Sequence, residues 1–374
     1  MTSIALMSVP LHGHVHPMLG LAAELVRRGH EVTFASGEDF ADVIAATGAR
    51  AVTYPSTLRS TRTGAGDWIA SEEVGARAVD LFAEERAAAF EPLLRAYETI
   101  GRPDVVVFDQ VTAVAEVLAS RWAVPTVQFS PTHALPKSQP THGGRLSSGA
   151  PCIVALPESF QAPFPDLPDG IAFVGPISWR REEPGSWSSD DAPLVLVSLG
   201  TTFNQRTDVV RAVAAAVSDL RPEHQIIVAL GRPLRSDDAD GWPTRTRVEP
   251  WVPQQEVLGL ADLFVTAGGT GSVLEAACAR TRIVVLPQAP EQMLNARQVV
   301  ALGLGTAYAG PDPSREEIRD VIEAAFALDD YSEAASRFAL DVDRAGGAAH
   351  AADIVEAAIT PDARNAQHRQ DQKG

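Results

Sequence analysis

The stretch VTAGGTGSVLEA, residues 265–276, decides how the second half of this chain folds. An apolar segment leads into a loop of three glycines and two small hydroxyl side chains, and a helical pattern follows. The first N–H groups of a helix lack partners and the helix dipole is positive there, so such a loop favours an anion such as a phosphate. The same residues also suit an ordinary tight turn. The surrounding sequence has to separate these two interpretations.

Buried strands and helices alternate on both sides of this stretch. Near the N-terminus, a predicted helix begins at Pro17 and ends at Gly29, between strands at 3–9 and 31–36. Apolar strands separated by helices predict parallel sheets covered on both faces. Further strands are predicted at 49–56, 103–109, 125–130, 194–203 (a strand that leads into a loop), 225–231, 263–267 and 282–287, and helices at 40–48, 74–99, 113–123, 209–220, 254–261, 272–279, 291–302, 314–328 and 331–358. Residues 152–157 and 171–176 are short apolar runs.

This alternation is interrupted by an aperiodic loop at 131–151 and later by a polar, proline-punctuated segment, which we interpret as a linker. We therefore predict an α/β protein of two Rossmann-like, doubly wound domains that face a cleft, because ligands of open α/β sheets bind beyond the carboxyl ends of the strands. The predicted boundaries are 1–178 for the first domain, 179–192 for the linker, 193–360 for the second domain and 361–374 for a polar tail.

Composition limits the function classes. The 374 residues carry a formal net charge of −17, which repels nucleic acids and anionic lipid surfaces. The two cysteines, Cys152 and Cys278, are far apart in sequence, as expected in a reducing cytoplasm, and provide no thiolate metal cluster. Apolar runs stay shorter than the roughly 18 residues of a membrane helix, and the N-terminus is typical of a strand and not of a signal peptide. We expect a cytoplasmic protein without membrane insertion.

Chemistry-bearing residues follow several of the predicted strands. The segment PLHGHVHP, 10–17, comes after the first strand, and Asp109 closes the strand VVVFD. In the second half, EPWVPQQEVL at 249–258 and LPQAPEQMLNA at 286–296 flank the glycine-rich loop.

These segments carry a family resemblance. WVPQ, GGTGSVLEA and PEQMLNA, within 249–296, and GHVHPMLGLAAELVRRGHEVTF near the N-terminus resemble the GT-B nucleotide-sugar-dependent glycosyltransferases of the bacterial macrolide and antibiotic type, related to the UDP-glycosyltransferases. The resemblance covers nearly the whole chain. It implies a first domain that binds the acceptor, a second domain that binds the nucleotide sugar, and sugar transfer with inversion.

The resemblance assigns the catalytic pair to the first domain. His14 occupies the position of the family's catalytic histidine, and an imidazole with a pKa near 6.5 suits a base that removes the acceptor's proton. Asp109 matches the aspartate that orients this imidazole and stabilises its protonated form. Taken alone, a histidine in a loop is more often a surface or hydrogen-bonded residue.

The donor residues lie in the second domain. Trp251 matches the tryptophan that stacks on the nucleotide base, whereas an isolated tryptophan is more often part of a core. Glu275 aligns with the acid that reads ribose hydroxyls, which favours uridine over thymidine nucleotides. Glu291 and Gln292 match the pair that binds the donor sugar, although they also suit a helix-capping pair after Pro290. The remaining predicted donor residues are Val252, Gln254, Gly268, Gly269, Thr270, Gly271 and Ser272, and also Ser198, Gly200 and Thr201, for which an ordinary turn is the alternative.

We expect no cofactor and no metal. The histidines of HGHVH at 12–16 alternate, yet no cysteine or carboxylate completes a ligand set at a suitable spacing, and the family uses no metal. DDAD at 237–240 and DVD at 341–343 match a metal-binding Asp-x-Asp motif by letters only, and we interpret both as solvated charge.

Two positions depart from the family pattern. Ala267 stands where the family has a histidine that contacts the diphosphate, and a methyl group cannot donate a hydrogen bond, so Ala267→His is expected to raise the transfer rate if the loop is otherwise family-like. The segment 131–151 is shorter than the helical excursion that covers the acceptor pocket in most relatives, which implies an open pocket or a completing partner.

The sequence thus predicts an inverting glycosyltransferase that moves a sugar from a UDP- or dTDP-activated donor to a hydroxyl of a small lipophilic natural product. The alternative is a non-catalytic or weakly active homologue that binds nucleotide or a partner enzyme. A nicotinamide dehydrogenase is disfavoured because no G-x-G-x-x-G follows the first strand. The expected partners are a nucleotide-sugar donor and a lipophilic acceptor but no nucleic acid, and a homodimer is compatible with the sequence.

Overall fold

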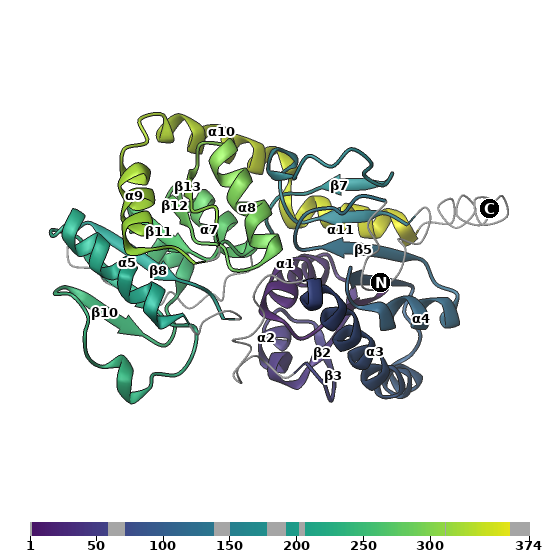
Figure 1. Cartoon of the computed structure of the whole chain (residues 1–374). Coiled ribbons are helices and arrows are strands. Elements are labelled where there is room, and N and C mark those ends of the chain that lie inside the picture. Colours follow the sequence, from purple (N-terminus) through teal and green to yellow (C-terminus); the bar gives the residue numbers. More distant parts are fainter. Residues whose placement is uncertain are drawn as a thin grey trace. The chain divides into compact units, whose positions relative to one another are not determined.

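The computed structural model describes residues 2–58, 72–137, 150–177, 192–201, 206–310 and 312–359. Within these residues the chain divides into two compact units (Figure 1). Of the described residues, the first unit contains 2–58, 75–137, 150–177 and 341–359, and the second contains 72–74, 192–201, 206–310 and 312–340. The predicted linker, apart from its last residue, and the predicted tail lie outside the described residues.

A seven-stranded parallel sheet forms the centre of the first unit, as described. Alternate side chains of its strand Ser3–Met7 point to opposite faces, so Ile4 and Leu6 join one apolar cluster while Ala5 and Met7 join another. The strand order is β3-β2-β1-β4-β5-β6-β7, with β1 Ser3–Met7, β2 Glu31–Gly37, β3 Arg50–Tyr54, β4 Val105–Asp109, β5 Thr126–Ser130, β6 Cys152–Val154 and β7 Ile171–Phe173.

Helices cover both faces of this sheet because both faces are apolar. One cluster includes side chains of α1 and α11, and the other includes side chains of α3 and α4. The bounds are α1 His12–Arg27, η1 Glu38–Phe40, α2 Ala41–Ala45, α3 Glu72–Ile100, α4 Ala113–Trp122, η2 Glu158–Phe160 and α11 Gly347–Ile359.

The second unit repeats the design with six described parallel strands in the order β10-β9-β8-β11-β12-β13. The strands are β8 Leu194–Ser198, β9 Gln225–Ala229, β10 Thr246–Glu249, β11 Leu263–Thr266, β12 Arg282–Val285 and β13 Gly305–Ala307. The helices are α5 Thr207–Leu220, η3 Ser236–Asp238, α6 Gln254–Leu258, α7 Thr270–Ala279, α8 Pro290–Ala301, α9 Arg315–Phe326 and α10 Tyr331–Ala345.

The two sheets place their strands in equivalent orders. In each, the first strand of the unit lies beside the fourth, and connections leave these two strands toward opposite sides. Such a switch point is where open α/β sheets bind ligands, at the carboxyl ends of the strands. The pair β1 and β4 forms it in the first unit, and β8 and β11 form it in the second. The prediction of two Rossmann-like domains is confirmed.

The helix predicted to begin at Pro17 begins at His12 instead, and Pro17 lies inside it. Proline lacks an N–H, so Pro17 cannot bond the carbonyl of Gly13, and a helix tolerates this near its first turn. The earlier start matters because it places His14 within the helix. The short strands β10 and β13 were not predicted, since few residues in either are both apolar and alternating.

The helix predicted over 331–358 is two helices. Gly346 and Gly347 adopt φ values of +85° and +57°, a left-handed conformation that ends α10, and the Gly347 N–H donates to the Val174 carbonyl at 2.7 Å. The structure therefore groups α11 with the first unit, whereas 193–360 had been predicted as one domain. The reason is burial: Ala351, Ala352 and Val355 are completely buried in the first unit's core.

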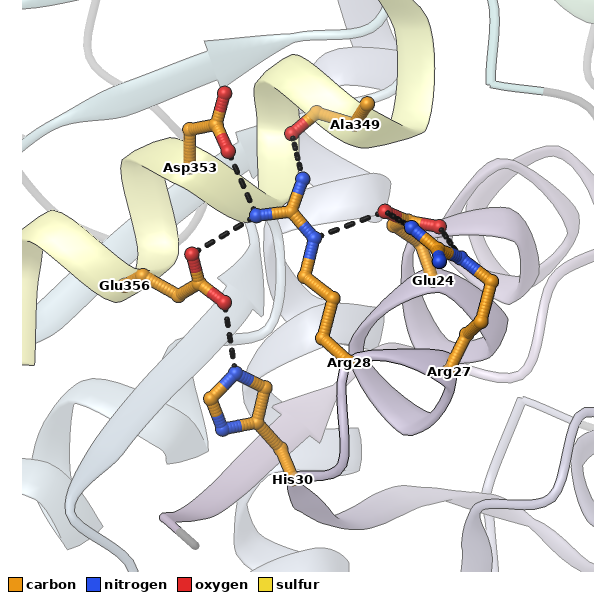
Figure 2. Close-up of polar contacts among 7 residues, drawn as sticks. All are labelled: Glu24, Arg27, Arg28, His30, Ala349, Asp353 and Glu356. Carbon is orange, nitrogen blue, oxygen red and sulfur yellow. Dashed lines mark hydrogen bonds and ion pairs between the residues drawn. The ribbon is translucent and has the colours of Figure 1, made fainter.

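Charged side chains join α11 to α1 within the first unit (Figure 2). The Arg28 guanidinium donates to Glu24 at 2.8 Å, to Asp353 at 2.6 Å and to Glu356 at 2.8 Å, and also to the Ala349 carbonyl. Hydrogen bonds from Arg27, and those from Arg28, lower the pKa of Glu24 to about 2, although desolvation opposes them. Arginine at the end of α1 thus fixes a helix more than 300 residues away in sequence.

Candidate active site

The first unit brings His14 and Asp109 together at its switch point. His14 lies in the first turn of α1, directly after β1, and Asp109 is the last residue of β4. Their side chains meet with 2.7 Å between His14 Nδ1 and Asp109 Oδ2. Asp109 is completely buried, whereas 22% of the His14 side chain is exposed. Since Nδ1 faces the carboxylate, Nε2 is the nitrogen that can accept a proton from outside.

Further contacts fix the aspartate. The Val111 N–H donates to Asp109 Oδ1 at 2.9 Å, and the Thr112 N–H donates to the Asp109 carbonyl. Thr112 also accepts a hydrogen bond from the Val9 N–H through its hydroxyl, at 3.0 Å, which ties the end of β1 to the turn after β4. A fully buried carboxylate held in this way orients the imidazole and can stabilise its protonated form.

The other two histidines of this segment form a separate contact. His12 Nδ1 lies 3.2 Å from His16 Nε2, and both rings pack near Phe40. Desolvation, together with the neighbouring His12, lowers the pKa of His16 to about 4. Over the described residues, no group of three or more histidine, cysteine or acidic side chains could hold a metal ion.

A small pocket lies beside this pair, and the sequence had not indicated the role of Glu85 in it. Val9 and residues 111–114 line the pocket together with Tyr54 and four residues of α3, among them Glu85. Glu85 is 2% exposed, and its carboxylate accepts from the Ser56 hydroxyl and from the N–H and hydroxyl of Thr57 at 2.7–2.8 Å. Desolvation, and the Glu85 charge, raise the pKa of Tyr54. In the sequence Glu85 looks like any charge on an amphipathic helix.

In the second unit the glycine-rich loop follows β11 and starts α7. Gly268 has a φ of +91°, and a Cβ there would lie 2.5 Å from Val285 Cγ1, so only glycine fits. Gly269 is the N-cap residue of α7, and no side chain caps this end. The backbone N–H groups of Thr270, Gly271 and Ser272 occupy the first turn, where an anion can bind them.

Side chains of α8 form hydrogen bonds with this loop. Thr270 is buried, and its hydroxyl donates to Glu291 Oε1 at 2.8 Å. Asn295, which is completely buried, donates to the Gly268 carbonyl at 2.8 Å and to the Thr270 hydroxyl at 3.0 Å. The Gln292 side-chain carbonyl accepts from the N–H of Gln288, the residue before the N-cap Ala289 of α8, at 2.7 Å. The sequence prediction missed Asn295, although it lies within the quoted motif PEQMLNA.

A second group of polar side chains joins α6 to α7. The amide of Gln254 donates to the Ser272 hydroxyl at 3.2 Å and to Glu275 at 2.6 Å, and Gln255 donates to the other oxygen of Glu275 at 3.1 Å. Gln255 was not predicted, because the motif WVPQ ends one residue earlier. Trp251 precedes this group with 46% of its surface exposed, and Val252 is half-buried.

The loop after β8 completes the described part of the second switch point. Ser198 is buried, and its hydroxyl accepts from the Gly200 N–H at 3.4 Å. Gly200 has a φ of +84° and Thr201 is half-buried. A Cβ on Gly231 would lie 2.1 Å from the Gly200 carbonyl oxygen. The loops after β8 and β9 therefore pack closely because position 231 has no side chain.

Two predictions about other residues are corrected or refined. Asp238 of DDAD is not solvated: it is 3% exposed and accepts from both terminal nitrogens of Arg232, at 2.6 and 2.8 Å. Ala267 is 2% exposed and belongs to the apolar core between β11 and its covering helices. The segment 131–151 lies outside the described residues between 138 and 149.

Known proteins resemble the chain over nearly its whole length. Residues 176–339 match the family model "UDP-glucoronosyl and UDP-glucosyl transferase". The demethyllactenocin mycarosyltransferase of Streptomyces fradiae is 32% identical over 96% of this chain and 87% of its own length, and the oleandomycin glycosyltransferase of Streptomyces antibioticus is 32% identical over 95% and 90%. The solved structure of the glycotransferase of kitacinnamycin is 28% identical with a TM-score of 0.82, over 96% of this chain and 99% of that one.

Proposed function

This chain belongs to the UDP-glucoronosyl and UDP-glucosyl transferase family, and it is a glycosyltransferase with a nucleotide-sugar donor and a GT-B fold. On that premise we propose that it transfers the sugar of a UDP- or dTDP-activated donor, with inversion, to a hydroxyl of a small lipophilic natural product. The observation that carries the proposal is the His14–Asp109 pair at the first switch point. A neutral imidazole on a buried carboxylate is the arrangement that activates a hydroxyl nucleophile.

In the proposed reaction the acceptor oxygen attacks the anomeric carbon while its proton passes to His14 Nε2. The bond from the anomeric carbon to the diphosphate oxygen breaks, and its electron pair leaves with the nucleoside diphosphate. A single displacement of this kind inverts the configuration. Asp109 stabilises the imidazolium, and the N–H groups at the start of α7 stabilise the departing phosphate charge without a metal.

Several observations support the assignment of the donor. The exposed indole of Trp251 is available for stacking on a base, and the Glu275 carboxylate, oriented by Gln254 and Gln255, can accept from ribose hydroxyls. Glu291, whose carboxylate accepts a hydrogen bond from Thr270, is the proposed partner for hydroxyls of the sugar. A ribose reader favours uridine nucleotides, whereas thymidine nucleotides lack one hydroxyl.

The acceptor proposal depends on the relatives. Two relatives with 32% identity are named for demethyllactenocin and oleandomycin.

The described part of the chain includes no helix long and apolar enough to cross a membrane.

The test is His14→Ala, assayed with UDP- and dTDP-sugars and a panel of macrolide, polyketide and flavonoid acceptors. We expect transfer to fall at least about a hundredfold, since a general base contributes about 10²–10⁴-fold. Nucleotide affinity, measured by thermal shift, should stay unchanged. NMR of the product should show the inverted anomer, and EDTA should not slow the wild-type enzyme. A His14→Ala enzyme with wild-type turnover would refute the proposed base.

A further inference from the structure

We propose that Asn295 is a positioning residue that sets both halves of the donor site at once, the diphosphate loop through Gly268 and the sugar-binding Glu291 through Thr270. This inference depends on the proposed function, because it concerns how that donor site is held. Asn295 itself is completely buried behind the loop and reaches none of the positions at which a ligand can bind.

The contact with Gly268 orients a peptide bond. Asn295 Nδ2 donates to the Gly268 carbonyl at 2.8 Å, which holds that oxygen toward the interior. In a trans peptide the C=O and the following N–H point in opposite directions, so the Gly269 N–H is turned away from Asn295. The buried amide thus fixes the direction of an N–H that can bind an anion.

The contact with Thr270 continues to α8. The Thr270 hydroxyl has one proton, and it donates this proton to Glu291 Oε1 at 2.8 Å while its oxygen accepts from Asn295 at 3.0 Å. Thr270 therefore serves the phosphate through its backbone N–H and not through its hydroxyl. The hydroxyl links the start of α7 to the carboxylate that is to bind the sugar.

Two substitutions separate these roles. Thr270→Val keeps the shape and the Asn295–Gly268 bond but removes the link to Glu291, so affinity for free UDP or dTDP should stay within about twofold while KM for the sugar nucleotide rises about tenfold. Asn295→Ala removes both contacts and should weaken free nucleotide and sugar nucleotide alike, by about tenfold to a hundredfold. Thr270→Ser retains the hydroxyl and should restore wild-type values.

The measurements are calorimetric titration with UDP, dTDP and a UDP-sugar, steady-state kcat and KM, and the melting temperature of each variant. Gln298→Ala, on the same helix, is the matched control and should change none of the affinities. Variants that melt earlier but bind all ligands as the wild type does would reduce Asn295 to a merely structural role and overturn the proposal. If the wild-type protein bound no nucleoside diphosphate, the proposed function would fail as well, which distinguishes the two failures.

Discussion

The two switch points of this molecule have equivalent strand orders but opposite chemistry. The first presents side chains: His14 follows β1, and Asp109 ends β4. The second switch point offers backbone groups instead. No side chain fits at Gly268, and the first turn of α7 provides backbone N–H groups. Moving a proton requires a titratable group, whereas stabilising a diphosphate requires fixed dipoles that approach closely. One topology therefore supports either task, according to which residues follow the strands.

Asp109→Asn should break the first switch point with the largest effect. The Asn amide can donate to His14 Nδ1, which would place the ring's proton on Nε2 and remove its ability to act as a base. We expect the transfer rate to fall by about 10³–10⁴-fold, with nucleotide affinity unchanged. The measurement is kcat at saturating donor. Asp104→Asn, at the other end of the same strand region, is the control and should remain active.

Gly268→Ala should break the second switch point through its backbone. The added Cβ would meet Val285 Cγ1 at 2.5 Å, in a left-handed conformation that alanine adopts at a cost of about 1–3 kcal/mol. We expect a lower melting temperature and a loss of nucleotide affinity of at least about tenfold. Gly271→Ala, where a Cβ meets nothing within 4 Å, should melt no earlier than the wild type. Equal melting of both variants would contradict the proposed strain.

Ala267→His tests whether a side chain improves the second switch point. The sequence had suggested a faster enzyme, but the burial of Ala267 in the core changes that expectation. An imidazole must displace its neighbours, at about 1–3 kcal/mol, so we expect a lower melting temperature and no gain in turnover. A faster variant with unchanged stability would show that the ring reaches the diphosphate after all.

The smallest effect is expected for a substitution of Glu24, a residue of α1 in the first unit. The Glu24 carboxylate, with a folded pKa of about 2 against an ordinary 4.5, stabilises the fold fully above pH 4.5. This contribution is lost as the pH falls from about 4.5 toward 2. We expect Glu24→Gln to lower the melting temperature at pH 7 and to flatten its decrease across that range, with nucleotide affinity at pH 7 unaffected. A variant with the same acid profile as the wild type would exclude this role.

Much of the fold follows from local pattern. Runs such as VVVFD and LVLVS, in which the first four residues are all apolar, fit strands buried on both faces, and the helices between such strands allow parallel pairing. The errors fall where long-range contacts decide. Polar β10 becomes a strand because β9 offers an edge, and α11 joins the first unit because its alanines and Val355 fill a core built from residues far earlier in the chain.

The sequence by itself, through its family resemblance, indicated candidate residues for the chemistry: His14 and the glycine loop follow buried strands, and Asp109 ends one. Only the tertiary structure decided how they are held. Asn295, Glu85 and Gln255 look ordinary in sequence, and their roles arise because the fold brings their donors or acceptors to within about 3 Å of partners on other elements or loops. The physical reason is that a hydrogen bond depends on distance and direction in space. Sequence spacing predicts these only for residues of the same helix or strand.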